Sequence, residues 1–168
     1  AELHFHGDSC DVFGLLCHRD AKSGGITKFV SSVAIHNEMF RRRPDLVEQL
    51  AGPWCRDRRE EVPPGKDPWF ELPVFCFAAG YFSTSWHNYY IRSAQRFGEL
   101  PCLTEAQVEA LDMLDTLGEE LRFDKTIEPG NIKFLHNHVI AHSRVKYEDW
   151  PEPERKRHLL RLWLATPG

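Results

Sequence analysis

Several features common in other protein classes are missing from this 168-residue sequence, and their absence narrows its possible functions. No stretch approaches the roughly 18 consecutive apolar residues of a transmembrane helix. Positive charge is not in excess, since 21 Lys and Arg stand against 25 Asp and Glu, for a net charge of −4. A slightly acidic chain is a poor binder of polyanions. We therefore expect neither a membrane nor a nucleic acid as a partner.

The cysteines lack the pattern of a disulfide framework or a zinc ribbon. There are five, an odd number, and none forms a Cys-x-x-Cys pair. The segment Ala1–His6 also lacks the basic region and long apolar stretch of a signal peptide. These observations predict free thiols in a reducing compartment, and hence a cytoplasmic protein.

The chain does contain enough apolar residues, 42%, to form the core of one domain spanning residues 1–168. Apolar runs and turn residues predict strands near 12–17, 27–31, 72–77, 81–85, 121–127, 132–135 and 157–164. Helices are predicted from Ser32 to about residue 40, over 45–50, and from a capping box at Thr104 to about Gly118. Because strands and helices do not alternate, we expect a mainly β sandwich or barrel with helical insertions.

One segment has the composition of a loop. Residues 52–68 are rich in proline and in charges of both signs. A long loop inside a compact domain is often functional, so we interpret this segment as a lid or surface loop.

The first ten residues contain a possible pair of metal ligands. Residues 3–8 alternate in the manner of a strand, so the His6 imidazole and the Asp8 carboxylate, two residues apart in His6-Gly7-Asp8, are expected on one face of it. A third ligand is available from a distant cluster: His136, His138 and His142. Two histidines and one carboxylate form the facial triad of non-heme Fe(II) oxygenases. The pattern also fits a surface His–Asp pair, and His4 with His6 would instead suggest a cupin-type site.

Two arginines near the carboxyl end have the same parity on a predicted strand. Arg157 and Arg161 alternate there with Leu159 and Trp163. Arginines with apolar neighbours suggest a carboxylate partner. Ordinary surface arginines are the alternative interpretation.

Taken together, these stretches resemble the taurine dioxygenase-like (TauD/TfdA) family of Fe(II)- and 2-oxoglutarate-dependent oxygenases. The resemblance rests on residues 6–16, 21–27, 137–144 and 155–163, and so extends through nearly the whole chain. It implies a double-stranded β-helix, or jelly-roll, core. It also implies that His6, Asp8 and His142 bind Fe(II), while His136 and His138 support or pack around the site.

The resemblance further implies how a cosubstrate is held. Arg161 matches the arginine that pairs with the far carboxylate of 2-oxoglutarate, and Thr27 matches the threonine that binds the same group. Arg157 matches a second arginine near the metal-bound end. The implied reaction consumes O2, oxidises a small organic substrate, for example by hydroxylation, and releases succinate and CO2. Asp8 argues against halogenation, because related halogenases have a small residue there.

The family resemblance also makes Trp86 and His87, which follow a predicted hairpin, candidates for the substrate pocket. Packing of these aromatic side chains around the turn is the alternative. Family members carry a substantial segment before the His-x-Asp motif, which we expect to be absent here. A truncated, non-catalytic or partner-dependent member of the same fold is therefore the second hypothesis. In that case a second copy or a partner subunit would cover the missing segment.

Overall fold

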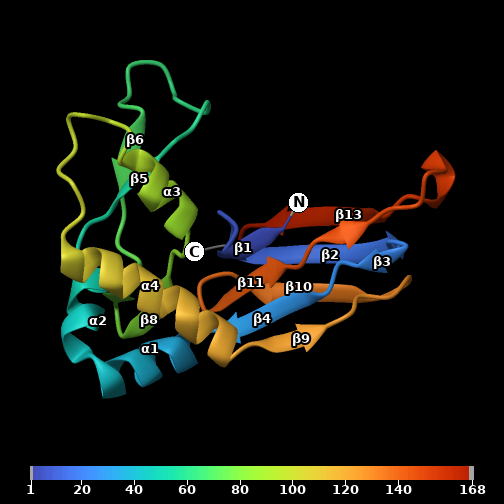
Figure 1. Cartoon of the computed structure of the whole chain (residues 1–168), viewed down its shortest axis with the longest axis horizontal. Helices are drawn as coiled ribbons and strands as arrows, with labels where there is room; N and C mark the ends of the chain where they lie inside the picture. Colours follow the sequence, from blue (N-terminus) through green and yellow to red (C-terminus); the bar gives the residue numbers. More distant parts are fainter. Residues whose placement is uncertain (1, 167–168) are drawn as a thin grey trace.

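The computed structural model describes residues 2–166 and consists mainly of β-strands, with four α-helices gathered at one end (Figure 1). The strands up to the first helices are β1 (Leu3–His6), β2 (Val12–Arg19), β3 (Ser23–Gly24) and β4 (Thr27–Ser31). The central region contains α1 (Ser32–Arg42), α2 (Pro44–Ala51), β5 (Cys55–Asp57), β6 (Trp69–Glu71), β7 (Phe75–Ala78), β8 (Tyr81–Thr84), α3 (Asn88–Ala94) and α4 (Glu105–Glu120). The remainder contains β9 (Phe123–Lys125), β10 (Ile132–His136), β11 (Ile140–Arg144), β12 (Tyr147–Glu148), a short 3-10 helix (Pro153–Arg155) and β13 (His158–Leu164).

Two sheets form the β part. One has the strand order β1-β11-β4-β9, and the other has the order β10-β2-β13. Short ribbons β12-β3, β5-β6 and β7-β8 complete the pairing. The main-sheet strands pair antiparallel, and the chain alternates between the sheets from β9 through β10 and β11 to β13. The mainly β prediction with helical insertions is therefore confirmed.

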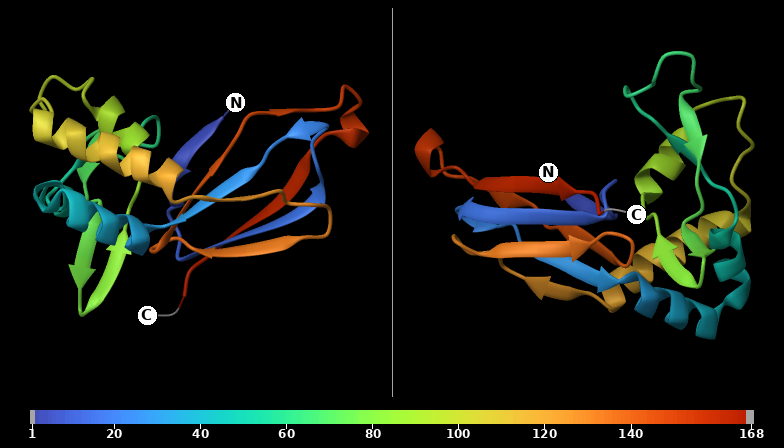
Figure 2. Two further views of the ribbon diagram at one scale, coloured as in Figure 1. Left: turned by 60° about the horizontal axis from the view of Figure 1, so that its bottom comes forward. Right: turned by 180° about the vertical axis from the view of Figure 1, so that it is seen from behind.

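The main apolar core lies where the helices meet the first sheet. It joins residues of α1, α2 and α4 to Phe5 of β1, Val30 of β4 and Ala141 of β11. Figure 2 shows these helices grouped at one end of the sheets. The core thus ties together β1 and β11, which carry His6 and His142, and β4, which pairs with β11.

The helix predictions were close, with differences of one or two residues. Thr104 and Gln107 form the predicted capping box, and α4 continues to Glu120. Helix α1 begins at the predicted Ser32, and Ser31 caps it, because the Ser31 side chain accepts a hydrogen bond from the Ala34 N–H.

The segment 52–68 is more structured than its composition suggested. It contains strand β5, in which Arg56 and Asp57 are buried, as is the preceding Trp54. The exposed remainder extends between β5 and β6 (Figure 1). Its role as a lid stays a prediction.

None of the helices within residues 2–166 has the length and apolar character needed to cross a membrane. All five cysteines are free thiols.

Candidate metal centre and cosubstrate site

Strand pairing brings the three predicted metal ligands together. His6, the last residue of β1, lies directly opposite His142 of β11. Asp8 follows two residues after His6, and one ligand atom from each of the three residues lies within 4.8 Å of the others. His142 Nε2 is 3.5 Å from Asp8 Oδ2, and the rings of His6 and His142 are 4.5 Å apart. Residues 136 positions apart in sequence therefore form one cluster through strand register.

The imidazole of His142 is suited to binding a metal in its neutral form. Burial lowers the pKa of His142 to about 2, and the nearby His6 and Lys133 act in the same direction. His6 Nδ1 donates to the His4 carbonyl at 2.7 Å, which leaves Nε2 of His6 with its lone pair. His4 itself is exposed and contributes only this carbonyl, so the geometry does not favour a cupin-type pair.

One oxygen of the Asp8 carboxylate lacks a hydrogen-bond partner. Asp8 Oδ2 and His142 Nδ1 are both buried, and neither has a hydrogen-bond partner in the part of the chain described. Burial raises the pKa of Asp8, whereas nearby basic groups lower it: His6, Arg161 and Lys133. Two imidazoles and a carboxylate oxygen without a hydrogen-bond partner form a donor set that suits Fe(II) with open coordination positions. The residues present therefore fit the metal that the sequence predicted.

The loop that carries Asp8 is fixed from two sides. The Gly7 N–H donates to the Trp86 carbonyl at 3.1 Å. The Asp8 N–H donates to Asn137 Oδ1 at 3.2 Å, and Asn137 Nδ2 donates to the Cys10 carbonyl at 2.9 Å. Asn137 is one of the residues that sequence reasoning missed, although it immediately follows His136 in the histidine cluster.

Thr27 and Arg157 lie on one side of the metal cluster. Phe29 is opposite His142, and Thr27 is opposite Arg144, two residues further along the same strand pair. Two residues along a strand span about 7 Å. Buried Thr27 therefore lies about that far along the sheet from the level of the metal ligands, and we call its level the Thr27 layer.

Arg157 reaches toward the same layer. Its guanidinium packs on the Tyr147 ring at 5.1 Å, beside that of Arg144 at 4.7 Å. Its Nε is 3.6 Å from the position that a Cβ on Gly25 would take. This nitrogen is buried and has no hydrogen-bond partner among the described residues.

Arg161 lies elsewhere. It is exposed on β13, its guanidinium is 4.8 Å from the Trp163 ring centroid, and its charge lowers the pKa of Asp8. It lines a cavity of about 660 Å³ together with His6 and Asp8. The structure thus separates the two arginines, with Arg157 toward Thr27 and Arg161 at the metal face.

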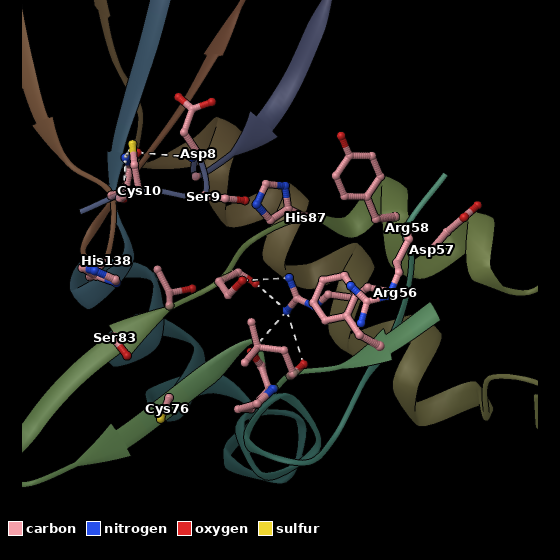
Figure 3. Close-up of a pocket in the computed structure, with 18 of the residues that line it drawn as sticks. Asp8, Ser9, Cys10, Arg56, Asp57, Arg58, Cys76, Ser83, His87 and His138 are labelled. Atoms are coloured by element: carbon pink, nitrogen blue, oxygen red, sulfur yellow. Dashed lines mark hydrogen bonds between the residues drawn. The ribbon is translucent and has the colours of Figure 1, made fainter. Parts of the chain in front are cut away.

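A second cavity, of about 560 Å³, adjoins the cluster on another side (Figure 3). Asp8 and His87 line both cavities. Burial lowers the pKa of His87 to about 3, so this candidate substrate residue is neutral. His138, which lines the second cavity, bonds Asp11 at 2.8 Å, whereas His136 is exposed.

Trp86 belongs to the apolar core. It is 1% exposed, stacks on Phe5 with ring centroids 5.5 Å apart, and lines neither cavity. This position agrees with the alternative interpretation, packing of the aromatic side chain around the turn, and a substrate role for Trp86 stays a prediction. Trp86 acts on the site through its backbone carbonyl.

Buried Arg56 was also missed by sequence reasoning. Its guanidinium bonds the Ser85 hydroxyl and the carbonyls of Leu72, Pro73 and Ser85 at the wall of the second cavity (Figure 3). It lies in the segment expected to be a loop, where an arginine is ordinarily exposed.

Comparison with known proteins gives one family match. A family model described as "Taurine catabolism dioxygenase TauD, TfdA family" matches residues 1–163. The chain is 31% identical to FR-33289 synthase of Streptomyces rubellomurinus, over 96% of this chain and 49% of that protein. It is 32% identical to taurine hydroxylase-like protein SAT17 of Stachybotrys chartarum, over 99% of this chain and 45% of that protein. The chain thus spans about half the length of these relatives.

Solved structures share the fold. An asparagine oxygenase in complex with Fe(II), 3-hydroxyasparagine and succinate superimposes with a TM-score of 0.73 at 21% identity. The non-heme iron oxygenase OrfP in complex with Fe superimposes with a TM-score of 0.74 at 14% identity. The matches cover 99% of this chain and 50% and 52% of the two others.

Proposed function

The chain belongs to the TauD, TfdA family of taurine catabolism dioxygenases, and from that premise we propose that it carries the Fe(II)- and 2-oxoglutarate-binding site of an oxygenase. The observation that carries the proposal is the convergence of His6, Asp8 and His142, with a buried carboxylate oxygen that lacks a partner. The substrate is a small organic molecule, since the adjoining cavities fall within the size range of small-molecule sites.

The proposed core is a double-stranded β-helix. Its support is the way the chain crosses between two facing antiparallel sheets, with β1, β4 and β11 in one and β2, β10 and β13 in the other. Such an arrangement places the two ends of the metal motif on neighbouring strands.

We assign the metal to His6, Asp8 and His142, and the far carboxylate of 2-oxoglutarate to Thr27 and Arg157. This assignment exchanges the roles that the resemblance implied for the two arginines. Its support is that Arg157 extends toward the Thr27 layer, while Arg161 shares a cavity with His6 and Asp8. Arg161 then interacts with groups at the metal end of the site.

When bound, ferrous iron would supply reduction of O2 coupled to conversion of 2-oxoglutarate to succinate and CO2, with oxidation of the substrate. The protein's residues provide the surroundings. Phe13 stacks on His142 at 4.9 Å and holds the imidazole plane while excluding water from that side. His87 stays neutral at physiological pH and faces the substrate as a hydrogen-bonding group.

The test is anaerobic titration of the chain with Fe(II) and 2-oxoglutarate, followed in the visible range. A weak metal-to-ligand charge-transfer band is expected for the wild type and for His136→Ala, which removes an exposed histidine outside the cluster. The band should be absent in His142→Ala. A cooperatively folded wild-type chain without the band would overturn the proposal for this chain.

A partner-dependent member of the fold is the second candidate. It is favoured by apolar side chains exposed on the sheet β10-β2-β13: Ile132, Phe134, Leu160, Leu162 and Leu164. Exposed apolar patches of this kind mark interaction surfaces, and further polypeptide would cover them. Light scattering decides between the candidates. A monomer that gives the charge-transfer band would exclude partner dependence, whereas a band confined to an oligomer would favour it.

A further inference from the structure

A half-buried lysine lies close enough to the metal cluster and to Arg157 for its charge to interact with both Asp8 and Arg157. Lys133 of β10 is opposite Leu15 of β2, and Leu15 is in turn opposite Arg161 of β13. Its Nζ is 4.9 Å from the centroid of the Phe29 ring and 5.5 Å from that of Phe13. Both rings adjoin the metal cluster, since Phe29 is opposite His142 and Phe13 stacks on it. The ammonium is therefore one side chain away from a proposed metal ligand.

Among the described residues, no carboxylate lies within ion-pair distance of this ammonium. Within residues 2–166 it makes neither a hydrogen bond nor an ion pair, and its contacts are the two aromatic faces. Burial lowers the pKa of Lys133 to about 8, Arg157 lowers it as well, and Asp8 opposes the shift. Partial burial of a cation without an ion-pair partner is unfavourable, and an anion bound beside it would offset this cost.

Charge balance indicates which anion fits. A ferrous ion with Asp8 leaves one net positive charge, and Arg157 and Lys133 add two more. A dicarboxylate with one end at the metal and the other near Arg157 would extend past Lys133. The aromatic faces hold the ammonium by cation–π attraction, which leaves its N–H groups free to donate.

We propose that Lys133 is a further cosubstrate-binding residue, whose ammonium pairs with a carboxylate of 2-oxoglutarate between the metal cluster and Arg157. The inference rests on the proposed function, and it adds to the threonine and arginine positions that the family resemblance implies. Lys133 acts as a positioning residue for the cosubstrate and also disfavours monocarboxylic 2-oxo acids, which would neutralise one positive charge fewer than the dicarboxylate does.

The test is cosubstrate affinity rather than turnover. Lys133→Met retains an unbranched side chain but removes the charge, and we expect the Kd of 2-oxoglutarate in the anaerobic Fe(II) titration to rise about tenfold or more. Tenfold corresponds to about 1.4 kcal/mol. Lys133→Arg should stay within about threefold of wild type. Lys125→Met, at an exposed position on β9, is the matched control and should leave the Kd unchanged.

A second readout separates cosubstrate binding from a structural role. Co(II) affinity in the absence of 2-oxoglutarate should be unchanged or higher in Lys133→Met, because a positive charge near Asp8 has been removed. Loss of Co(II) affinity together with cosubstrate affinity would overturn the proposal, as would equal 2-oxoglutarate Kd values for wild type and Lys133→Met. If Lys133→Met does not fold, Lys133→Gln replaces it, with the same expectation. Absence of the charge-transfer band in the wild type would instead refute the proposed function itself.

Discussion

Replacing Asn137 with alanine tests whether one buried amide holds the loop that carries Asp8. The side chain is 3% exposed, accepts from the Asp8 N–H at 3.2 Å and donates to the Cys10 carbonyl at 2.9 Å. Its removal leaves two partly buried backbone groups without partners. At about 1–1.5 kcal/mol each, the free energy of unfolding should fall by about 2–3 kcal/mol. Groups that orient metal ligands typically contribute about 10–100-fold to affinity, so metal binding should weaken by a similar factor.

Two assays measure these effects separately. Urea unfolding followed by tryptophan fluorescence gives the change in stability, and titration with Co(II) followed in the visible range gives the metal affinity. Asn131→Ala is the control, because Asn131 Oδ1 accepts from the Glu128 N–H at 3.2 Å in an exposed turn and bonds no residue of the Asp8 loop through its side chain. Equal urea midpoints and equal Co(II) affinities for wild type and Asn137→Ala would refute the reasoning.

Three further predictions concern the same region. His6→Ala should abolish Co(II) binding while His4→Ala retains it, since only the His6 ring belongs to the cluster; the opposite result would favour the cupin-type pair. Trp86→Ala should cost about 3–5 kcal/mol of stability in thermal unfolding, because a fully buried ring is lost, and a cost below about 1 kcal/mol would contradict its core position. His87 should make the metal-free protein sensitive to acid. The pKa of His87 is about 3 in the folded state and about 6.5 in the unfolded state, so the unfolded state binds a proton first as the pH falls. The stability that neutral His87 allows is therefore fully present above pH 6.5 and is lost progressively as the pH falls toward 3. The loss is at most about 1.4 kcal/mol per pH unit, and His87→Asn should flatten this part of the stability–pH curve; an unchanged slope would count against burial of His87 as a neutral group.

The parts of the structure that follow local rules could be predicted from the sequence. Helix α4 begins at a capping box, and its apolar residues recur at helical spacing. Strands β2, β4 and β10 are short apolar or alternating runs bounded by turn residues. The candidate ligands could be named because a His-x-Asp motif combined with a distant histidine is typical of few functions other than metal binding.

The parts set by tertiary contacts could not be predicted in this way. Strand β5 lies in a charged segment and is held by buried Arg56, whose partners are backbone carbonyls 16 to 29 residues away. Helix α3 is only seven residues long, too short to show a periodic pattern. Lys133 alternates along β10 with apolar residues, and this pattern alone predicts that its charged side chain faces solvent. In the structure the apolar neighbours are exposed, and the pairing of β10 with β2 places Lys133 on the side of the metal cluster.

The helical end of the molecule takes part in shaping the metal centre. Gly118 of α4 permits the close packing behind β1, because a Cβ there would lie 2.8 Å from Trp86 and 3.0 Å from Phe5. Phe5 immediately precedes His6, and the Trp86 carbonyl accepts from the Gly7 N–H. The packing of one helix against two aromatic rings thus fixes the backbone on both sides of His6. Since the position of His142 is set independently by the pairing of β11 with β4, the geometry of the cluster depends on both the β-sheet and the helical insertion.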